Sequence, residues 1–159
     1  MKPLSCLALV ALVCGLLFSG CTTGVDRPDS ITVSVANLKA LNMSLSETQF
    51  SMTLRFTSES LNAYGFAGST HRLFINGGYV GKAVTSKPIG LPPLTSMTQD
   101  VTLTVENGAL MQQILQASGN PVVHYRLESV LLTKTGDDEV KVKMNFDGTL
   151  DLSKLHVGS

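Results

Sequence analysis

The side chains that could do acid–base or metal chemistry are few and widely spaced. Three histidines, His71, His124 and His156, are expected on strand faces or near a terminus, and none is spaced with a second ligand as metal sites require. The carboxylates of residues 137–139 fall at an expected hairpin tip, where exposure to water explains them. No Gly-x-Ser-x-Gly segment marks a nucleophile, and no glycine-rich loop opens a helix to bind phosphate. We therefore expect no enzyme, no catalytic residue, no metal and no cofactor, and a Ser/His/Asp triad assembled across space is the enzymatic alternative.

One cysteine, Cys21, has a defined chemical context. It follows a segment with a positive residue near its start, an uncharged apolar stretch over residues 4–18 and small residues at its end, which is the layout of a secretory signal. The stretch is shorter than the roughly 20 residues of a membrane-spanning helix. The sequence LFSGC at residues 17–21 resembles a bacterial lipobox, whose cysteine is lipidated, with Phe18 where an aliphatic residue is usual. We expect a signal peptide over residues 1–20 and lipid attachment at Cys21; the alternative is an ordinary cysteine beside a plain secretory cleavage site.

Lipidation at Cys21 also explains how the cysteines are used. Cys6 and Cys14 lie inside the expected signal peptide, so Cys21 would be the single thiol of the exported chain, without a disulfide partner. One acyl chain holds a protein at a membrane only marginally, so stable attachment needs at least two. Thr22 stands where an aspartate would favour the inner membrane, by resemblance to bacterial sorting rules. We expect a lipid-anchored protein of the cell envelope, at the outer membrane facing the periplasm, with the lipidated N-terminus and tether over residues 21–30.

Charge and composition exclude other classes of protein. The chain has 159 residues, with 12 basic and 12 acidic side chains, and 43% of its residues are hydrophobic. Without residues 1–20 there remain 11 basic and 12 acidic residues, a charge of −1, because only one lysine and no acid is removed. A near-neutral chain has no cationic excess to neutralise phosphates, so we expect no nucleic-acid partner. The hydrophobic content argues against disorder, and the length fits one domain, which we expect over residues 31–155.

Hydrophobic and polar residues alternate along most of the chain after residue 30. A period of two predicts strands with one face on a core and the other in water, as in an antiparallel sheet. The clearest case is residues 140–152, with apolar side chains on one face and lysine, asparagine, aspartate and threonine on the other. The sequence thus predicts an all-β, antiparallel β-sandwich of about seven strands with one short helix. The other expected strands are residues 31–35, 50–57, 71–75, 79–85, 100–106 and 122–134.

Turn residues and one helix complete the expected fold. The Asn-Gly-Gly sequence at residues 76–78 has the composition of a tight hairpin, since a type I′ turn needs positive φ at both central positions. Prolines within residues 88–93 mark a crossing loop that cannot donate to a sheet ladder. In residues 107–119 apolar side chains fall at helical spacing, with Asn107 placed to cap the start and Gly119 to stop the end. We expect this helix to plug an open end of the sandwich; binding a partner is the alternative.

Seven short motifs follow one another in an order that resembles a known family. They are MTLRFT (52–57), YGF (64–66), RLFING (72–77), VGKA (80–83), PI (88–89), LPP (91–93) and DVTLTV (100–105). The resemblance is to the late embryogenesis abundant type 2 family, also called the water stress and hypersensitive response (WHy) domain, and it covers residues 31–152. The family commonly has Asn-Pro-Asn after the second strand, where this chain has Ser-Glu-Ser at residues 58–60. The resemblance implies a fibronectin-III/immunoglobulin-like sandwich of two antiparallel sheets, similarity to bacterial lipoproteins linked to desiccation and other stress, and no catalytic residue.

We therefore expect a membrane-anchored, non-enzymatic lipoprotein with a WHy-like domain, protective or binding in water, desiccation or envelope stress. The alternative is a structural accessory subunit, in which an exposed strand edge or the short helix docks onto a larger envelope assembly. The expected partners are the lipid bilayer, through acylated Cys21, and an envelope protein. Arg55, Arg72 and Arg126 could form a polar stripe for a carbohydrate or lipid head group, although solvated strand faces explain them equally simply. No ligand-binding residue is assigned.

Overall fold

The structure is a computed structural model that describes residues 30–116, 121–135, 138–151 and 156–157. The expected signal peptide, the lipid-attachment residue Cys21 and nearly all of the tether lie outside the described residues. Residues 117–120, where we expected the helix to end, also lie outside them, as does the hairpin tip at residues 136–137.

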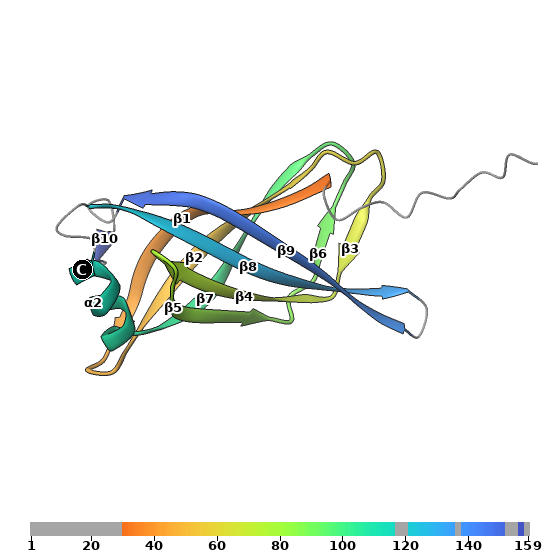
Figure 1. The fold of residues 1–159 in the computed structure, drawn as a ribbon. Coiled ribbons are helices and arrows are strands. Elements are labelled where there is room, and N and C mark those ends of the chain that lie inside the picture. Colours follow the sequence, from red (N-terminus) through yellow and green to blue (C-terminus); the bar gives the residue numbers. More distant parts are fainter. Residues whose placement is uncertain (1–29, 117–120, 136–137, 152–155, 158–159) are drawn as a thin grey trace, which may run out of the picture.

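Seven long strands make up the main sheet: β1 (Ile31–Met43), β2 (Glu47–Ser58), β4 (Gly68–Ile75), β5 (Gly78–Thr85), β7 (Ser96–Glu106), β8 (Val122–Thr135) and β9 (Asp138–Asp151). They are antiparallel, in the order β1-β2-β7-β5-β4-β8-β9 (Figure 1). A two-residue strand, β10 (His156–Val157), pairs parallel with β1 at the outer edge. Two short strands, β3 (Tyr64–Phe66) and β6 (Ile89–Leu91), form a separate antiparallel pair. The prediction of an all-β, sandwich-like fold with about seven main strands is confirmed.

The main sheet curls so that its two halves face each other across the core. One half holds β1, β2 and β7, and the other holds β5, β4, β8 and β9. The described strands β7 and β5 are joined only by the pairs from Gly81–Val105 to Ala83–Leu103. A side chain at Gly81 would run into the Thr104 carbonyl oxygen, so this glycine permits the close approach at the bend. The two layers of the sandwich are therefore two halves of one sheet.

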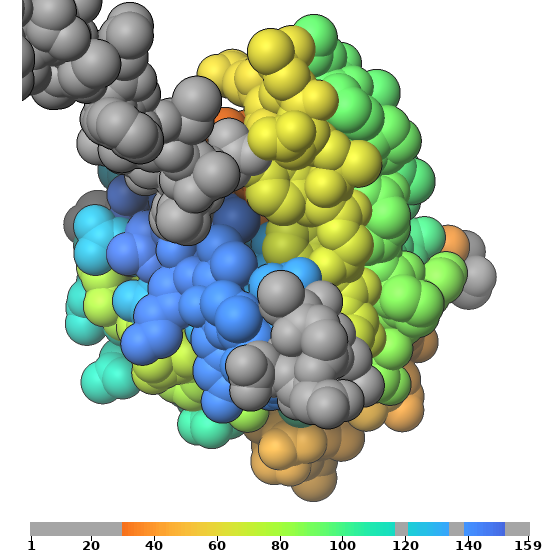
Figure 2. All heavy atoms as spheres, turned by 90° about the vertical axis from the view of Figure 1, so that its right-hand side faces the viewer, coloured from red at the N-terminus to blue at the C-terminus, as the bar shows by residue number. Residues whose placement is uncertain are grey.

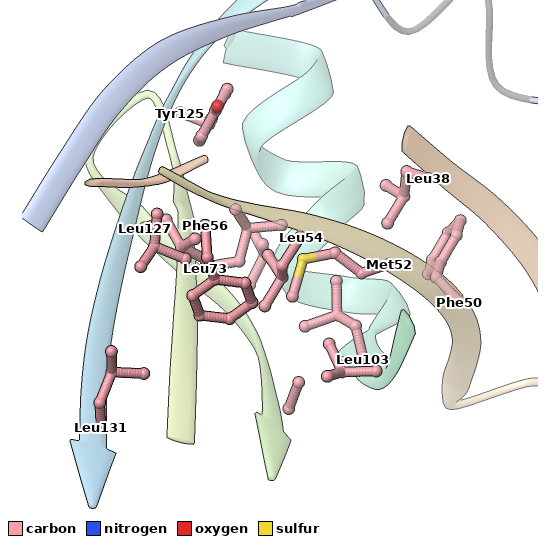
Figure 3. Packing of buried hydrophobic residues seen from close by; sticks show 14 of the residues in the cluster. Leu38, Phe50, Met52, Leu54, Phe56, Leu73, Leu103, Tyr125, Leu127 and Leu131 are labelled. Atoms are coloured by element: carbon pink, nitrogen blue, oxygen red, sulfur yellow. The ribbon is translucent and has the colours of Figure 1, made fainter. Parts of the chain in front are cut away.

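The inward faces of both halves supply one hydrophobic core. Figure 3 shows its side chains from β2, β4, β7 and β8 pointing toward one another. On β2 the apolar residues of the predicted alternation are the buried ones, and Met52, Leu54 and Phe56 are 0% exposed. Burying one such side chain contributes about 1.5–3 kcal/mol, so this core is the main source of stability.

A tyrosine closes the curl where the outer strands meet. The Tyr125 ring of β8 lies under Gly148 of β9, where an added Cβ would come 2.7 Å from it. The Tyr125 hydroxyl accepts a hydrogen bond from the backbone N–H of Val35 on β1 at 3.2 Å. The Phe146 ring packs against Tyr125, with centroids 6.1 Å apart. Side-chain contacts thus join β1 and β9, which are not paired with each other among the described strands.

The β3–β6 pair covers the end of the core at which β1 begins. Phe66, Ile89 and Leu91 are buried, and the Tyr64 ring stacks on Phe66 with 6° between the ring planes. Figure 2 looks at this end and shows β3, in yellow, beside β6, in green. The crossing loop expected at residues 88–93 therefore contains a short strand, β6. The sequence pattern did not predict this strand, because three residues are too few to show an alternation of period two.

The hairpin between β4 and β5 has the turn that its Asn-Gly sequence predicts. Asn76 has φ 48° and Gly77 has φ 86°, so both central positions are positive, as a type I′ turn requires. The Asn76 N–H donates to the His124 carbonyl oxygen at 2.8 Å, and the His124 N–H donates to Asn76 Oδ1 at 3.3 Å. The predicted turn is confirmed, and these two hydrogen bonds fasten it to β8.

The expected helix is present as α2 (Asn107–Gln116), at the end of the sandwich opposite to β3 and β6 (Figure 1). Leu110 packs against the core from this end, although no side chain of α2 is fully buried. Asn107, predicted to cap the helix, has other side-chain partners: Oδ1 accepts from Thr48 Oγ1 at 2.7 Å and Nδ2 donates to the Ser44 carbonyl oxygen at 2.8 Å. It therefore ties α2 to the β1–β2 turn. None of the helices in the described residues has the length and apolar content needed to cross a membrane.

Candidate functional site

His71 lies inside the core and is sealed from solvent. It is 0% exposed, with Nδ1 2.8 Å from Ser129 Oγ and Nε2 2.8 Å from Ser69 Oγ. Burial lowers the pKa of His71 from 6.5 to about 4, so the ring is neutral at pH 7. Its strand face is the inner one, since it alternates in step with the buried Leu73 and Ile75. A substrate cannot reach this cluster, so its role is structural.

The outward faces of β5, β4, β8 and β9 carry aromatic, charged and amide side chains in register. Strand pairing aligns these side chains into rows that run across the strands, about 4.5–5.5 Å from one strand to the next. The first row begins at the β4–β5 turn. The rows are Asn76–His124–Thr149, Tyr79–Phe74–Arg126–Asp147 and Lys82–Arg72–Glu128–Asn145.

Two ion pairs run between neighbouring strands on this face. Arg126 Nε lies 2.9 Å from Asp147 Oδ1, and Arg72 Nη1 lies 3.4 Å from Glu128 Oε2. The hydrogen bond from Arg126 to Asp147 raises the pKa of this arginine above its ordinary value, so the guanidinium stays charged. Three of the four side chains are exposed and Glu128 is partly exposed, so the pairs add little to stability. Both guanidinium groups on this face already have a carboxylate partner.

An aromatic pair forms one side of the face. The Phe74 and Tyr79 rings meet edge to face, with centroids 5.7 Å apart and 66° between the planes. The Arg72 guanidinium lies 5.2 Å from the Phe74 centroid and 5.3 Å from the Tyr79 centroid. Cation–π attraction and the bond to Glu128 thus hold Arg72 between the rings and the carboxylate. Phe74 is fixed in one orientation, half-buried, at the border of a hollow.

These rows line an open hollow of about 570 Å³, which we name the trough. This volume falls within the range of small-molecule sites, about 300–1,000 Å³. Phe74 supplies an apolar wall, and Gly77, where an added Cβ would meet no atom within 4 Å, leaves the lining open beside it. The polar lining is Asn76, His124, Arg126, Glu128, Asp147 and Thr149.

The structure brings together two of the three arginines of the expected stripe. Arg72 and Arg126 lie on the face of the trough, whereas Arg55 lies on β2, between Ser34 of β1 and Thr98 of β7. The three arginines therefore do not form one stripe. Alternation predicts that each side chain points outward, but it does not tell on which half of the curled sheet.

Sequence reasoning did not single out Phe74, Tyr79 or Asp147. The β4–β5 turn predicts that Phe74 lies near Tyr79, since a two-residue hairpin fixes the register of its strands. The pairing of Phe74 with Arg126 joins strands far apart in the chain and has no local signal. Among the residues that the structure describes, no three His, Cys, Asp or Glu side chains lie close enough together to hold a metal ion.

A second hollow of about 290 Å³, which we name the α2 groove, lies between α2, the end of β1 and the start of β2. It is apolar, and its two polar residues, Thr48 and Asn107, are hydrogen-bonded to each other. Nearby apolar side chains are exposed, with Leu45 103% and Leu115 73% accessible. The apolar lining is Ala40, Met43, Phe50, Leu110, Met111 and Ile114.

Comparisons with known proteins show the fold and no family. No family model matches the chain, and no curated protein matches it. The chain is similar to the solution structure of AT1g01470 from Arabidopsis thaliana, with 14% identity over 76% of this chain and 80% of that one, at a TM-score of 0.53. A crystal structure of a protein from Archaeoglobus fulgidus also has 14% identity, over 77% of this chain and 94% of that one, at a TM-score of 0.47. The resemblance to the WHy family therefore stays a prediction.

Proposed function

We propose that this protein is a membrane-anchored, non-enzymatic lipoprotein with a WHy-like domain, which binds a ligand at the trough and protects the cell in water, desiccation or envelope stress. The observation that carries the binding role is the trough: an open hollow of about 570 Å³ with a fixed aromatic wall and a polar lining. The LFSGC segment at residues 17–21 supports the anchor, and the family resemblance supports the stress role.

The pairing of the charged groups supports binding rather than catalysis. A general base or nucleophile needs a free lone pair aimed at a substrate and a pKa suited to the reaction. In the trough, Arg126 and Asp147 are bonded to each other, and Glu128 is bonded to Arg72. The buried His71 is withdrawn from solvent and bonded at both ring nitrogens. The paired charges of the trough are therefore suited to orient a ligand rather than to act as a base or nucleophile, and His124 is the exposed imidazole of the lining.

The position of the trough also fits a domain on a short tether. β1 has 13 residues and spans about 40 Å from the end near β3 and β6 to the end near α2. The trough adjoins the β4–β5 turn, where a side chain at Gly78 would overlap Gln113 of α2. It therefore lies toward the end opposite to the start of β1. A tether from Cys21 would therefore join the folded domain at the end away from the trough.

The α2 groove favours a second candidate, a structural accessory subunit that docks onto a larger envelope assembly. Five of the exposed large apolar side chains gather at this end, and exposed apolar patches mark interaction sites in soluble proteins. A stoichiometric partner that co-purifies in mild detergent, and is lost on substitution of Met111 by Glu, would support this candidate. The five exposed apolar side chains at this end of the domain are Leu41, Met43, Leu45, Met111 and Leu115.

The stress role is tested by comparing the survival of a deletion strain and its parent after drying and rehydration. We expect the deletion strain to survive less well, and complementation with the full gene to restore survival. A Cys21→Ala gene separates anchoring from the folded domain and should restore less, since the exported domain would not stay at the membrane. Equal survival of deletion and parent strains would contradict the stress role.

A further inference from the structure

We propose that the trough binds a neutral, polyhydroxylated ligand, a saccharide of one or a few rings. This inference rests on the proposed binding role and names the ligand class for it. The three observations behind it are the charge balance of the lining, the order of its donors and acceptors, and the rigid aromatic wall.

The charge balance argues against an ionic ligand. An anion entering the trough would meet two carboxylates, Glu128 and Asp147, and one guanidinium, Arg126, already bonded to Asp147. A cation would have to compete with Arg126 and Arg72 for the same carboxylates. Breaking either pair would leave one of its charges without a partner. A neutral ligand avoids both penalties, because it can bond to the free edges of the paired groups.

The polar lining places hydrogen-bond donors beside acceptors on neighbouring strands. Arg126, a donor, faces the acceptor Asp147, and two residues away on each strand His124 faces Thr149, two side chains that can each donate and accept. Each ligand hydroxyl is both a donor and an acceptor, so adjacent hydroxyls can bond to a guanidinium and to its carboxylate at the same time. Such paired bonds to charged groups contribute more than bonds between neutral groups.

Phe74 supplies the surface for the apolar side of a sugar ring. Its ring lines the trough and is held by Tyr79 and Arg72, at 5.7 Å and 5.2 Å. The face of an aromatic ring is negative, and C–H groups next to oxygen are positively polarised, so they attract each other. The two hydrogen bonds between Asn76 and His124 fix the neighbouring wall. These contacts reduce the ordering of Phe74 and Asn76 that the binding step requires, which favours affinity in a small site.

The test measures binding of neutral and charged probes to the full-length protein in an amine-oxide detergent, because detergents with sugar or phosphocholine head groups would compete with the probes. The neutral probes are trehalose and sucrose, which are free solutes, and N,N′-diacetylchitobiose, a neutral analogue of β-1,4-linked N-acetylhexosamine polymers. The charged probes are inorganic phosphate and phosphorylcholine. We expect titration calorimetry to detect at least one neutral probe, with the same dissociation constant at low and high salt, since a neutral ligand is not screened. The neutral probe that binds distinguishes a free solute from a polymer unit.

Two variants with a matched control locate the site. Asp147→Asn keeps the shape of the side chain and removes its charge, so it should weaken the neutral probe roughly tenfold or more. Phe74→Leu removes the aromatic face and should weaken it as well. Arg55→Gln changes an exposed arginine outside the trough and should leave the dissociation constant unchanged. Equal thermal unfolding of the three variants shows that the fold is intact.

Any one of four results would overturn the proposal. Two concern the choice of ligand: no saccharide binds, or the protein prefers phosphate or phosphorylcholine. The other two are a saccharide affinity that falls as salt is added, and wild-type saccharide affinity in the folded Asp147→Asn protein. The drying experiment separates the two proposals. Failure of saccharide binding with a surviving drying defect would reject the ligand class alone, whereas binding without any drying defect would reject the stress role alone.

Discussion

The buried histidine predicts a specific loss of stability in mild acid. His71 is fully buried, its pKa falls from 6.5 to about 4, and its described neighbours are the uncharged Ser69, Ser129 and Phe56. Between these two pH values the unfolded chain binds a proton at this ring and the folded chain does not. The free energy of unfolding therefore falls as the pH drops below 6.5, and the loss levels off below about 4.

The size of this loss follows from the same two pKa values. At 1.36 kcal/mol per pKa unit, the interval from 6.5 to about 4 corresponds to a loss of about 3 kcal/mol, before any relaxation that admits water to the ring. Such a loss is a large fraction of the stability of a small domain, about 5–15 kcal/mol. It should be visible well above the acid range in which most carboxylates titrate.

Denaturant unfolding of the full-length protein between pH 7.5 and 4 measures this loss, with His71→Gln as the comparison. The variant removes the titrating ring but keeps a donor and an acceptor near the two serines. We expect the wild type to lose about 3 kcal/mol more than the variant over this interval. The difference between the two profiles isolates His71, because all other groups titrate in both proteins. Parallel profiles would refute the reasoning.

Two further predictions concern the contact that closes the sheet. Gly148→Ala should destabilise the fold by about 1–3 kcal/mol, because the added Cβ would come 2.7 Å from the Tyr125 ring. Gly65→Ala is the matched control, since no atom lies within 4 Å of its added Cβ, and equal unfolding midpoints for the two variants would contradict the account. Tyr125→Phe removes the acceptor for the Val35 N–H and should cost about 1 kcal/mol. Hydrogen exchange at Val35 that is no faster in this variant would show that the contact is not formed.

The strands and the tight turn could be predicted because their signals are local. On β2, Met52, Leu54 and Phe56 alternate with polar residues, and one buried face is enough to produce this pattern. At the β4–β5 turn, Asn76 and Gly77 are residue types that adopt a positive φ at little steric cost, so an Asn-Gly pair between two strands predicts this turn. Such preferences act within a few residues and can be read from one sequence.

The trough could not be predicted, because its parts meet only through long-range register. Phe74 and Arg126 lie on paired strands far apart in the chain, and a shift of the pairing by one residue would turn one of them inward. The same limit explains why Arg55 was grouped with arginines of the other half of the sheet. The side chain of Asn107 was predicted to cap its own helix for a similar reason, since the residue that bonds to its Oδ1, Thr48, is distant in sequence.

The central claim is that this fold works as a binding domain held to a membrane by lipid at Cys21. Mass spectrometry of the N-terminus of the mature protein, with Cys21→Ala as the control, tests it most directly. We predict a chain that begins at Cys21 and carries at least two acyl chains, and a variant released from the membrane fraction. A native N-terminus without acyl mass, or a variant that stays equally membrane-bound, would contradict the claim.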